Sequence, residues 1–126
     1  MILRRRPVCT KDIGQLVEQQ AEQFLRKQGL KTLERNFHTK AGEIDLIMED
    51  GDSLVFVEVR YRRQRGYGDG ADSVTWHKQQ RLIRAAQVYL QTRRQHDRPC
   101  RFDIVAGHGE QENIQLHWIK NAFDAF

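Results

Sequence analysis

The sequence predicts a single α/β domain: a mixed sheet of about five strands flanked by helices, in the order α-β-β-β-α-β-β-α. Three observations lead to this fold class. A chain of 126 residues suits one compact domain and leaves little room for a second. Two stretches carry apolar residues at helical spacing, and several shorter ones alternate apolar and polar residues between turn signals. A hydrophobic fraction of 39% can support a core rather than a disordered coil.

The first helix is predicted over 13–25, where apolar residues recur at helical spacing, and Gly29 follows as a C-terminal stop. Ahead of it, residues 1–10 form a basic N-terminal tail, so the domain is expected to span 11–126. A short strand over 33–38 follows the helix.

The next two strands, 43–48 and 54–61, alternate around the turn residues 49–52, which is a hairpin signal. After a loop rich in glycine and arginine, apolar residues over 82–90 trace one face of a second helix that begins near Thr75. Two more strands, over 101–106 and 114–118, and a short terminal helix complete the order.

Three carboxylates stand out in the hairpin, because acids are depleted in strands and like charges facing one another destabilise a sheet. Glu43 and Asp45 share one face of their strand, and Glu58 faces the same way if the loop has an even number of residues. A two-residue turn at 50–51 would place Glu43 opposite Glu58. A four-residue loop would place Asp45 opposite Glu58. The other face of the strand over 43–48 is expected to carry three apolar side chains, Ile44, Leu46 and Met48.

Two interpretations of these acids stay open. In the first, the acids lie on a solvent-facing surface of the sheet, which also shows polar alternation, and they have no catalytic role. Leu54 and Phe56 share the face with Glu58, however, and a partly buried cluster of acids without a counter-charge is costly. Magnesium, or manganese, is the natural partner, because such ions accept one or two carboxylates and add water and phosphate oxygens. The sequence has no HExxH motif or paired cysteine-histidine spacing that would favour zinc.

Charge and cysteine usage bear on partner and compartment. The net charge is +4, and basic residues cluster at 4–6, 61–65 and 93–98, which favours a polyanion partner. Cys9 and Cys100 stand far apart and look like ordinary thiols of a reducing compartment. No export signal or membrane span is evident, so we expect a cytoplasmic protein without a membrane partner.

An Asp, then Glu-x-basic on the following strand, after a helix, is the pattern of the PD-(D/E)xK nucleases. More narrowly, the chain resembles the small uncharacterised bacterial family often labelled YraN, which is similar to archaeal Holliday junction resolvases. The resemblance extends from about Ile13 to Phe126. It depends on the following residues: Glu18 with Ala21 and Leu25, Arg35-Asn36, Gly42-Glu43-Ile44-Asp45-Leu46-Ile47, Val55-Phe56-Val57-Glu58-Val59-Arg60, Lys78, Ala85-Ala86 with Tyr89-Leu90, and Arg101-Phe102-Asp103.

The resemblance implies a restriction-endonuclease-like three-layer core and a metal site. It makes Asp45 and Glu58 the metal-binding carboxylates and sets Arg60 in the motif's lysine position. Glu18 would be the acid of the first helix that can reach the metal, and Glu43 would assist from nearer the edge.

Arg60 departs from the motif. A lysine there can orient or deprotonate the attacking water, whereas a guanidinium stays protonated and can only stabilise charge. Lys78, near the start of the second helix, could supply the missing ammonium, or be a solvated first-turn lysine. Glu18 has a similar alternative as a plain boundary glutamate.

The segment 61–68 combines cations, aromatic rings and glycines directly after the acidic strand. Arg62, Arg63, Arg65 and Tyr67 are therefore candidates to follow a phosphate backbone and to stack on an exposed base, with a mobile basic loop as the alternative.

The function expected from the resemblance is a metal-dependent nuclease that acts on DNA, with branched or recombination intermediates as candidate substrates. A non-catalytic nucleic-acid-binding module with a degenerate nuclease site is the first alternative, and an adaptor for another protein is the second. The choice between DNA and RNA, between one metal ion and two, and between monomer and homodimer stays open at this stage.

Overall fold

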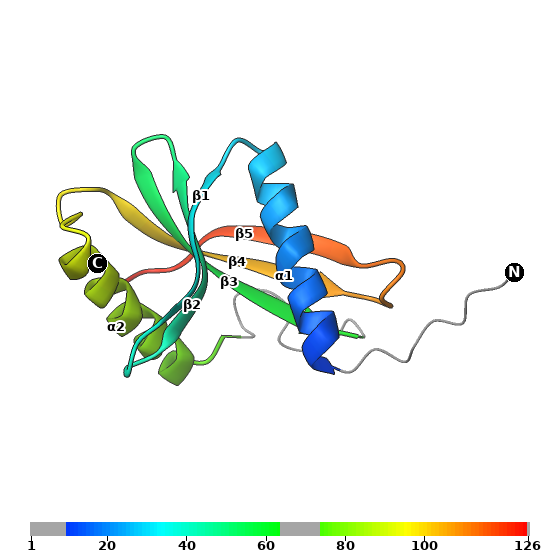
Figure 1. The fold of residues 1–126 in the computed structure, drawn as a ribbon. Coiled ribbons are helices and arrows are strands. Elements are labelled where there is room, and N and C mark those ends of the chain that lie inside the picture. Colours follow the sequence, from blue (N-terminus) through cyan, green and yellow to red (C-terminus); the bar gives the residue numbers. More distant parts are fainter. Residues whose placement is uncertain (1–9, 64–73, 126) are drawn as a thin grey trace, which may run out of the picture.

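The computed structural model describes residues 10–63 and 74–125. The elements in chain order are α1 (Thr10–Lys27), β1 (Lys31–His38), β2 (Glu43–Asp50), β3 (Ser53–Arg62), α2 (Trp76–Thr92), β4 (Cys100–His108) and β5 (Gln115–Phe123). The strands form one sheet in the order β1-β2-β3-β4-β5 (Figure 1). β3 and β4 are parallel and the other three pairs are antiparallel, with α2 as the crossover that parallel neighbours require. The mixed five-stranded sheet flanked by helices is confirmed.

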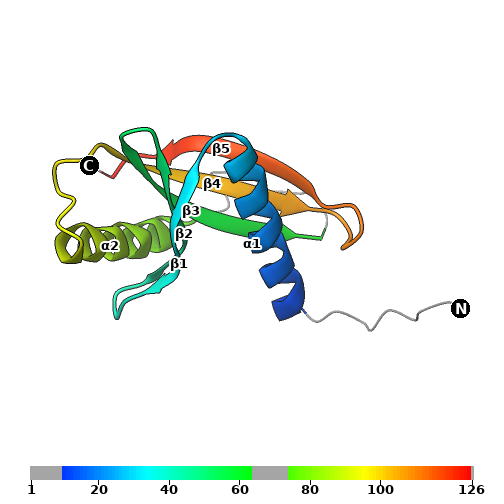
Figure 2. The ribbon, with the colours of Figure 1, turned by 45° about the horizontal axis from the view of Figure 1, so that its top comes forward.

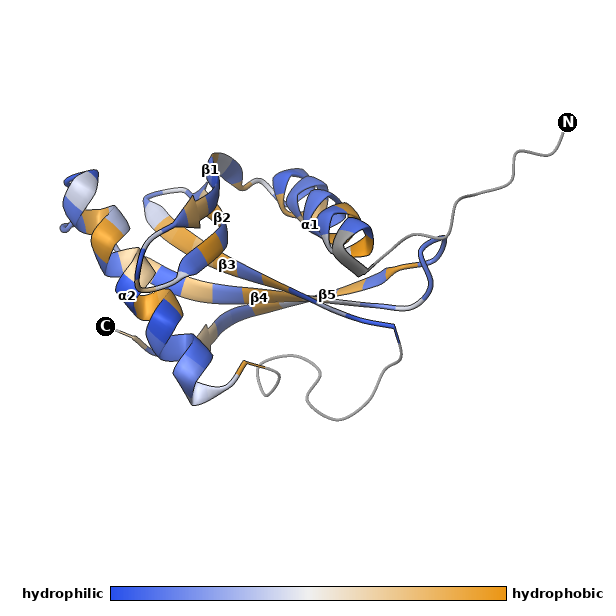
Figure 3. Ribbon diagram, turned by 60° about the horizontal axis from the view of Figure 1, so that its bottom comes forward, coloured by the Kyte–Doolittle hydropathy of each residue, from blue (hydrophilic) through white to orange (hydrophobic). Residues whose placement is uncertain are grey.

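The two helices pack on opposite faces of the sheet, which gives three layers (Figure 2). The side chains of β3 show that both faces of the sheet are covered, because they alternate between two apolar clusters. Val55 and Val57 pack in the cluster beneath α1, whereas Leu54 and Phe56 pack in the cluster beneath α2. Figure 3 shows apolar and polar bands along both helices and the strands, as expected for elements that bury one face.

Local signals end the helices where the sequence indicates. At the C-terminus of α1, Gly29 adopts a left-handed φ of 102° and the Leu30 N–H donates to the Leu25 carbonyl at 3.1 Å. At the start of α2, the Thr75 hydroxyl accepts the backbone N–H of Lys78 at 3.2 Å, which is an N-cap.

The β2–β3 hairpin has a two-residue turn at 51–52, so its loop is even, as expected. The paired residues run from the turn to Leu46 opposite Val57. The ladder ends one step before Asp45 and Glu58, which this register would set opposite one another. The structure thus has a two-residue turn, but its register is the one that we expected from a four-residue loop.

One expectation about β2 is wrong. Ile44 does not share a face with Leu46 and Met48: it packs with Ile47 in the cluster beneath α2, whereas the other two pack beneath α1. The alternation breaks at Asp45, where the ladder to β3 ends and the Asp45 carboxylate accepts the Val59 N–H at 2.8 Å.

The prediction of a short terminal helix is also wrong. Residues 119–123 continue β5, and the described residues that follow them are not helical. Asn121 has a left-handed φ of 50°, and the pairing with β4 shifts register there. This irregularity lets Phe123 stack on Phe102, at 4.9 Å between ring centroids. A strand with such a shift produces the i, i+3, i+4 apolar spacing that otherwise indicates a helix.

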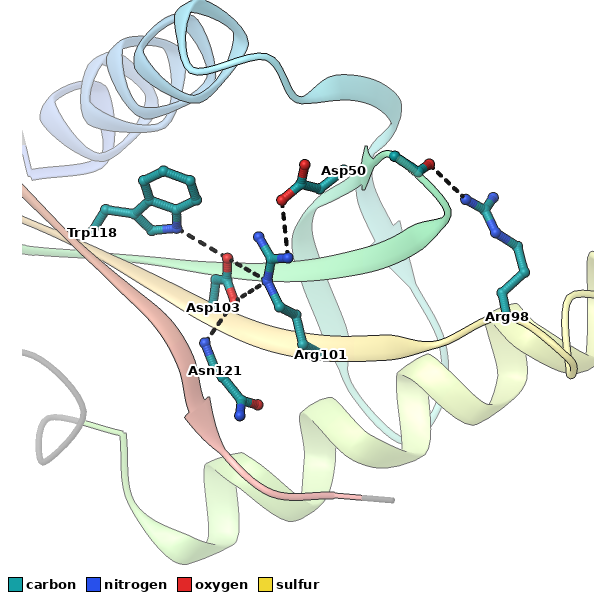
Figure 4. Close-up of polar contacts among 7 residues, drawn as sticks. Asp50, Arg98, Arg101, Asp103, Trp118 and Asn121 are labelled. Atoms are coloured by element: carbon teal, nitrogen blue, oxygen red, sulfur yellow. Dashed lines mark hydrogen bonds and ion pairs between the residues drawn. The ribbon is translucent and has the colours of Figure 1, made fainter.

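A buried polar network joins the end of β2 to β4 and β5 (Figure 4). Asp103 is only 1% exposed, and its carboxylate accepts Arg101 Nε at 3.0 Å, Trp118 Nε1 at 3.0 Å and the Asn121 N–H at 2.9 Å. Arg101 Nη1 also lies 3.0 Å from Asp50 Oδ2. Trp118 further packs edge-on against Phe24 of α1, so this ring helps to close the core.

Candidate active site

Three carboxyl groups from three different elements converge at the point where β2 separates from β3. Glu18 comes from α1, Asp45 from β2 and Glu58 from β3. Glu58 is only 5% exposed, and Asp45 is half-buried with one oxygen held by the Val59 N–H. The predicted convergence of acids depends on the hairpin register and on the break in alternation at Asp45.

The environment opposes the ionisation of all three groups. Burial raises the pKa of Glu58 to about 7, and the Asp45 charge adds to this. Burial also raises the pKa of Asp45, although the Val59 N–H counteracts it. The pKa of Glu18 rises to about 7 through burial and through the charges of Asp45 and Glu43. The site therefore favours the neutral forms of these carboxyl groups, chiefly because they are buried.

Among the residues that the structure describes, Lys78 is the one whose cation forms an ion pair with Glu58. Its Nζ lies 2.7 Å from Glu58 Oε1, and this contact acts to lower the pKa of that carboxyl against the effect of burial. The N-cap at Thr75 fixes the first turn of α2 that carries Lys78. Arg60, on the same strand as Glu58, acts on it through its charge, and its effect ranks below that of Lys78. Glu58 is thus paired with the ammonium of Lys78 from α2, whereas Arg60 of its own strand acts on it only through its charge.

Other predicted residues lie at the rim or beyond it. Glu43 is 61% exposed and pairs with His38 Nδ1 at 2.9 Å, although its charge still affects Glu18. Arg62 and Arg63 are exposed at the end of β3, and Arg63 Nε lies 2.8 Å from Glu110 Oε1. Arg65 and Tyr67 lie outside the described residues.

Two pockets adjoin the carboxyl groups, one on each side. The pocket next to α2 has a volume of about 220 Å³ and is lined by Glu43, Thr75, His77, Lys78, Arg81 and Leu82. The pocket next to α1 has a volume of about 370 Å³ and is lined by Gln15, Glu18, Gln19, Glu22, Arg35, Asn36, Asp45 and Leu46.

Several of these lining residues are absent from the sequence-based site. Arg81 follows Lys78 by one helical turn, and Gln15 and Gln19 flank Glu18 at spacings of three and one. Helical spacing from the two candidate residues could have found Arg81 and Gln15, since side chains three positions apart share a face, but it could not have found Gln19. Trp76 was also missed: it is exposed and its ring lies edge-on to His77, 5.3 Å between centroids.

The donor set suits a hard divalent cation better than a soft one. Within 10–63 and 74–125, no three Asp, Glu, His or Cys side chains are already grouped as a metal centre. Magnesium needs no such group, because it uses one or two protein carboxylates and keeps several waters. Asp45 and Glu58 could supply those two carboxylates, and a bound cation would favour their charged forms against the effect of burial.

Sequence comparisons identify relatives over nearly the whole chain. The profile described as "Uncharacterised protein family UPF0102" matches residues 17–106. A UPF0102 protein of Nitrosococcus oceani is 49% identical over 119 residues, which cover 94% of this chain and 96% of the relative. One from Pseudomonas syringae is 50% identical over 114 residues (89% and 93%), and one from Hahella chejuensis is 46% identical over 122 residues (97% and 98%). None of the helices in the part of the chain described here is long and apolar enough to cross a membrane.

Proposed function

The chain belongs to the uncharacterised protein family UPF0102, and on that premise we propose that it is a metal-dependent nuclease that hydrolyses phosphodiester bonds of DNA. Branched or recombination intermediates are the substrates that we propose first. The observation that carries this proposal is the convergence of Asp45 and Glu58 beside the ammonium of Lys78, from three separate elements.

The residues fit the chemistry of phosphoryl transfer. Asp45 and Glu58 would hold Mg²⁺ or Mn²⁺, with Glu18 and Glu43 close enough to add charge. When bound, such an ion supplies a water of lowered pKa and stabilises the negative charge that develops on the phosphate.

The cations of the chain have separate tasks in this proposal. Lys78 Nζ, held beside Glu58, can donate a hydrogen bond to a phosphate oxygen or to the attacking water. Arg60 carries a guanidinium, which cannot serve as a base, and it therefore contributes charge stabilisation and phosphate binding. We therefore assign to Lys78 the role of the motif's lysine, whose place in the sequence is held by Arg60.

The experiment compares purified wild-type protein with Asp45→Asn and Glu58→Gln on labelled linear DNA and on a four-way junction. Each reaction contains Mg²⁺ or Mn²⁺, with EDTA as the blank. Asp124→Asn, which changes an exposed acid near the C-terminus, is the matched control. We expect cleavage by wild type and by the control, and at least a 100-fold loss in both site variants. Equal nicking by all four proteins would point to a contaminant, and no cleavage of any DNA would refute the nuclease proposal.

A non-catalytic nucleic-acid-binding module is the second candidate. The observation that favours it is that Glu58 already has a cationic partner in Lys78 at 2.7 Å, in a site whose motif lysine is replaced by Arg60. This candidate predicts salt-sensitive DNA binding without metal-dependent cleavage. The proposed location is the cytoplasm in both cases, and the free thiol of Cys100 agrees with a reducing compartment.

A further inference from the structure

A groove continues the α1-side pocket away from the carboxyl groups. It has a volume of about 530 Å³ and is lined by Arg26, Gly29, Leu30, Lys31, Thr32 and Arg35. Arg35 also lines the pocket that contains Glu18 and Asp45. Arg35 thus borders both cavities, and the two together, which lie against α1 and β1 from Glu18 and Asp45 to Lys31, are called the channel below.

The chemistry of the walls changes along this channel. Next to the acids it presents three neutral amides, Gln15, Gln19 and Asn36. Further along it presents three cations, Arg26, Lys31 and Arg35, all of them exposed side chains. Neutral donors followed by cations suit a polyanion that approaches the metal site at one phosphate and extends away from it.

Arg35 is held in place at the junction of the two cavities. Its Nε lies 2.8 Å from Glu22 Oε1 and its Nη2 lies 2.7 Å from Glu22 Oε2, and the Thr32 hydroxyl donates to the same carboxylate at 2.6 Å. Two of the five guanidinium donors are thus used, and 58% of the side chain stays exposed. Because Glu22 offsets the charge of Arg35, Arg26 and Lys31 carry most of the net positive charge.

We infer that one strand of the DNA substrate leaves the carboxylate site along this channel, with its phosphates against Arg26, Lys31 and Arg35. The inference rests on the proposed function and adds where the substrate binds. Glu18 and Arg26 lie eight residues apart on α1, which is about 12 Å along the helix axis. Successive phosphates of one strand lie more than 3.4 Å apart, so a channel of this length faces only a short run of them.

The test measures DNA binding by fluorescence anisotropy in EDTA, so that it does not depend on cleavage. The double variant Arg26→Gln/Lys31→Gln is compared with wild type on a labelled single strand and on a duplex between 50 and 200 mM salt. Loss of two phosphate contacts should reduce the slope of log K against log salt by about 1.4 for the single strand and about 1.8 for the duplex. At 0.1 M salt, affinity should fall roughly 10- to 50-fold.

The matched control is Arg84→Gln/Lys120→Gln, which removes two exposed cations from α2 and β5, outside the basic clusters of the sequence. It makes the same change in net charge and should leave the slope unchanged. Equal losses in the two double variants would show a general charge effect, and an unchanged slope in the first would show that the channel is not used. Either result overturns the inference. All replaced side chains are exposed, and far-UV circular dichroism checks the fold.

The outcomes separate this inference from the nuclease proposal. If the Arg26→Gln/Lys31→Gln protein loses binding while wild type never cleaves DNA, the channel stands and the catalytic proposal fails. If wild type cleaves DNA and the double variant binds as wild type does, the channel fails and the nuclease stands. Failure of wild type to bind any DNA refutes both.

Discussion

The replacement Asp103→Asn tests whether the buried network of Figure 4 holds β4 and β5 together. The variant keeps the shape of the side chain but removes its charge, and it turns one acceptor atom into a donor. That donor would face other donors, namely Arg101 Nε, Trp118 Nε1 and the Asn121 N–H. Arg101 would be left as a mostly buried cation whose Nη2 already has no hydrogen-bond partner among the described residues.

Breaking a buried ion pair by removing one partner costs about 3–5 kcal/mol, out of the roughly 5–15 kcal/mol by which a domain is stable. For a chain of this size that corresponds to a fall in Tm of about 10–20 °C. Urea unfolding followed by tryptophan fluorescence measures the change, because the Trp118 indole donates directly to Asp103.

Asp50→Asn is the matched control. Asp50 contacts the same Arg101 at 3.0 Å but is 40% exposed, so its loss should cost less than about 1 kcal/mol. A second variant, Asp103→Leu/Arg101→Met, removes both charges of the pair and should recover only part of the loss, because the Trp118 indole and the Asn121 N–H lose their acceptor. If Asp103→Asn costs no more than Asp50→Asn, the interpretation of the network as a structural joint is refuted.

Three further predictions follow from other contacts. Lys78→Met should lower metal-dependent cleavage by about 100-fold or more, since it removes the ammonium beside the buried acid, and single-turnover rates on labelled DNA measure this; retention of the wild-type rate would exclude a catalytic task for Lys78. The guanidinium of Arg35 lowers the pKa of Glu22, so this carboxylate contributes stability above its unfolded pKa of about 4.5 and loses it as the pH falls through the folded value. Urea midpoints should therefore show Glu22→Gln as less stable than wild type by about 1–2 kcal/mol at pH 7, with a smaller difference at pH 3.5; an equal difference at both pH values would contradict this. Gly42→Ala should destabilise the protein by about 1–3 kcal/mol in thermal unfolding, because a Cβ there would lie 2.6 Å from the Arg81 carbonyl oxygen, whereas Gly14→Ala, which meets no atom within 4 Å, should not.

Local pattern was sufficient for all the helices and strands except the terminal helix, and for the face of β3 that carries Glu58. Alternation along β3 places Leu54, Phe56 and Glu58 on one face, and an even loop fixes the register of the hairpin up to Leu46. Both properties depend on neighbours in the sequence. They could therefore be predicted without knowledge of tertiary packing.

What the sequence did not predict depends on contacts between distant residues. The face of Ile44 changes because Asp45 leaves the ladder to bind the Val59 N–H, fourteen residues away. The terminal helix was wrong because a shift at Asn121, fixed by Asp103, changes which side chains of β5 face the core. The pairing of Lys78 with Glu58 and the channel along α1 likewise join segments that only the folded chain brings together.

The two outer strands of the sheet bear on how copies of this protein can associate. β1 and β5 each contain one asparagine with a left-handed backbone, Asn36 at φ 51° and Asn121 at φ 50°, and each shows a shift in its pairing. A strand interrupted in this way offers no long, regular row of backbone donors and acceptors to a neighbouring molecule. Any dimer should consequently form through helical or loop surfaces, and the sheet should not extend from one copy into the next.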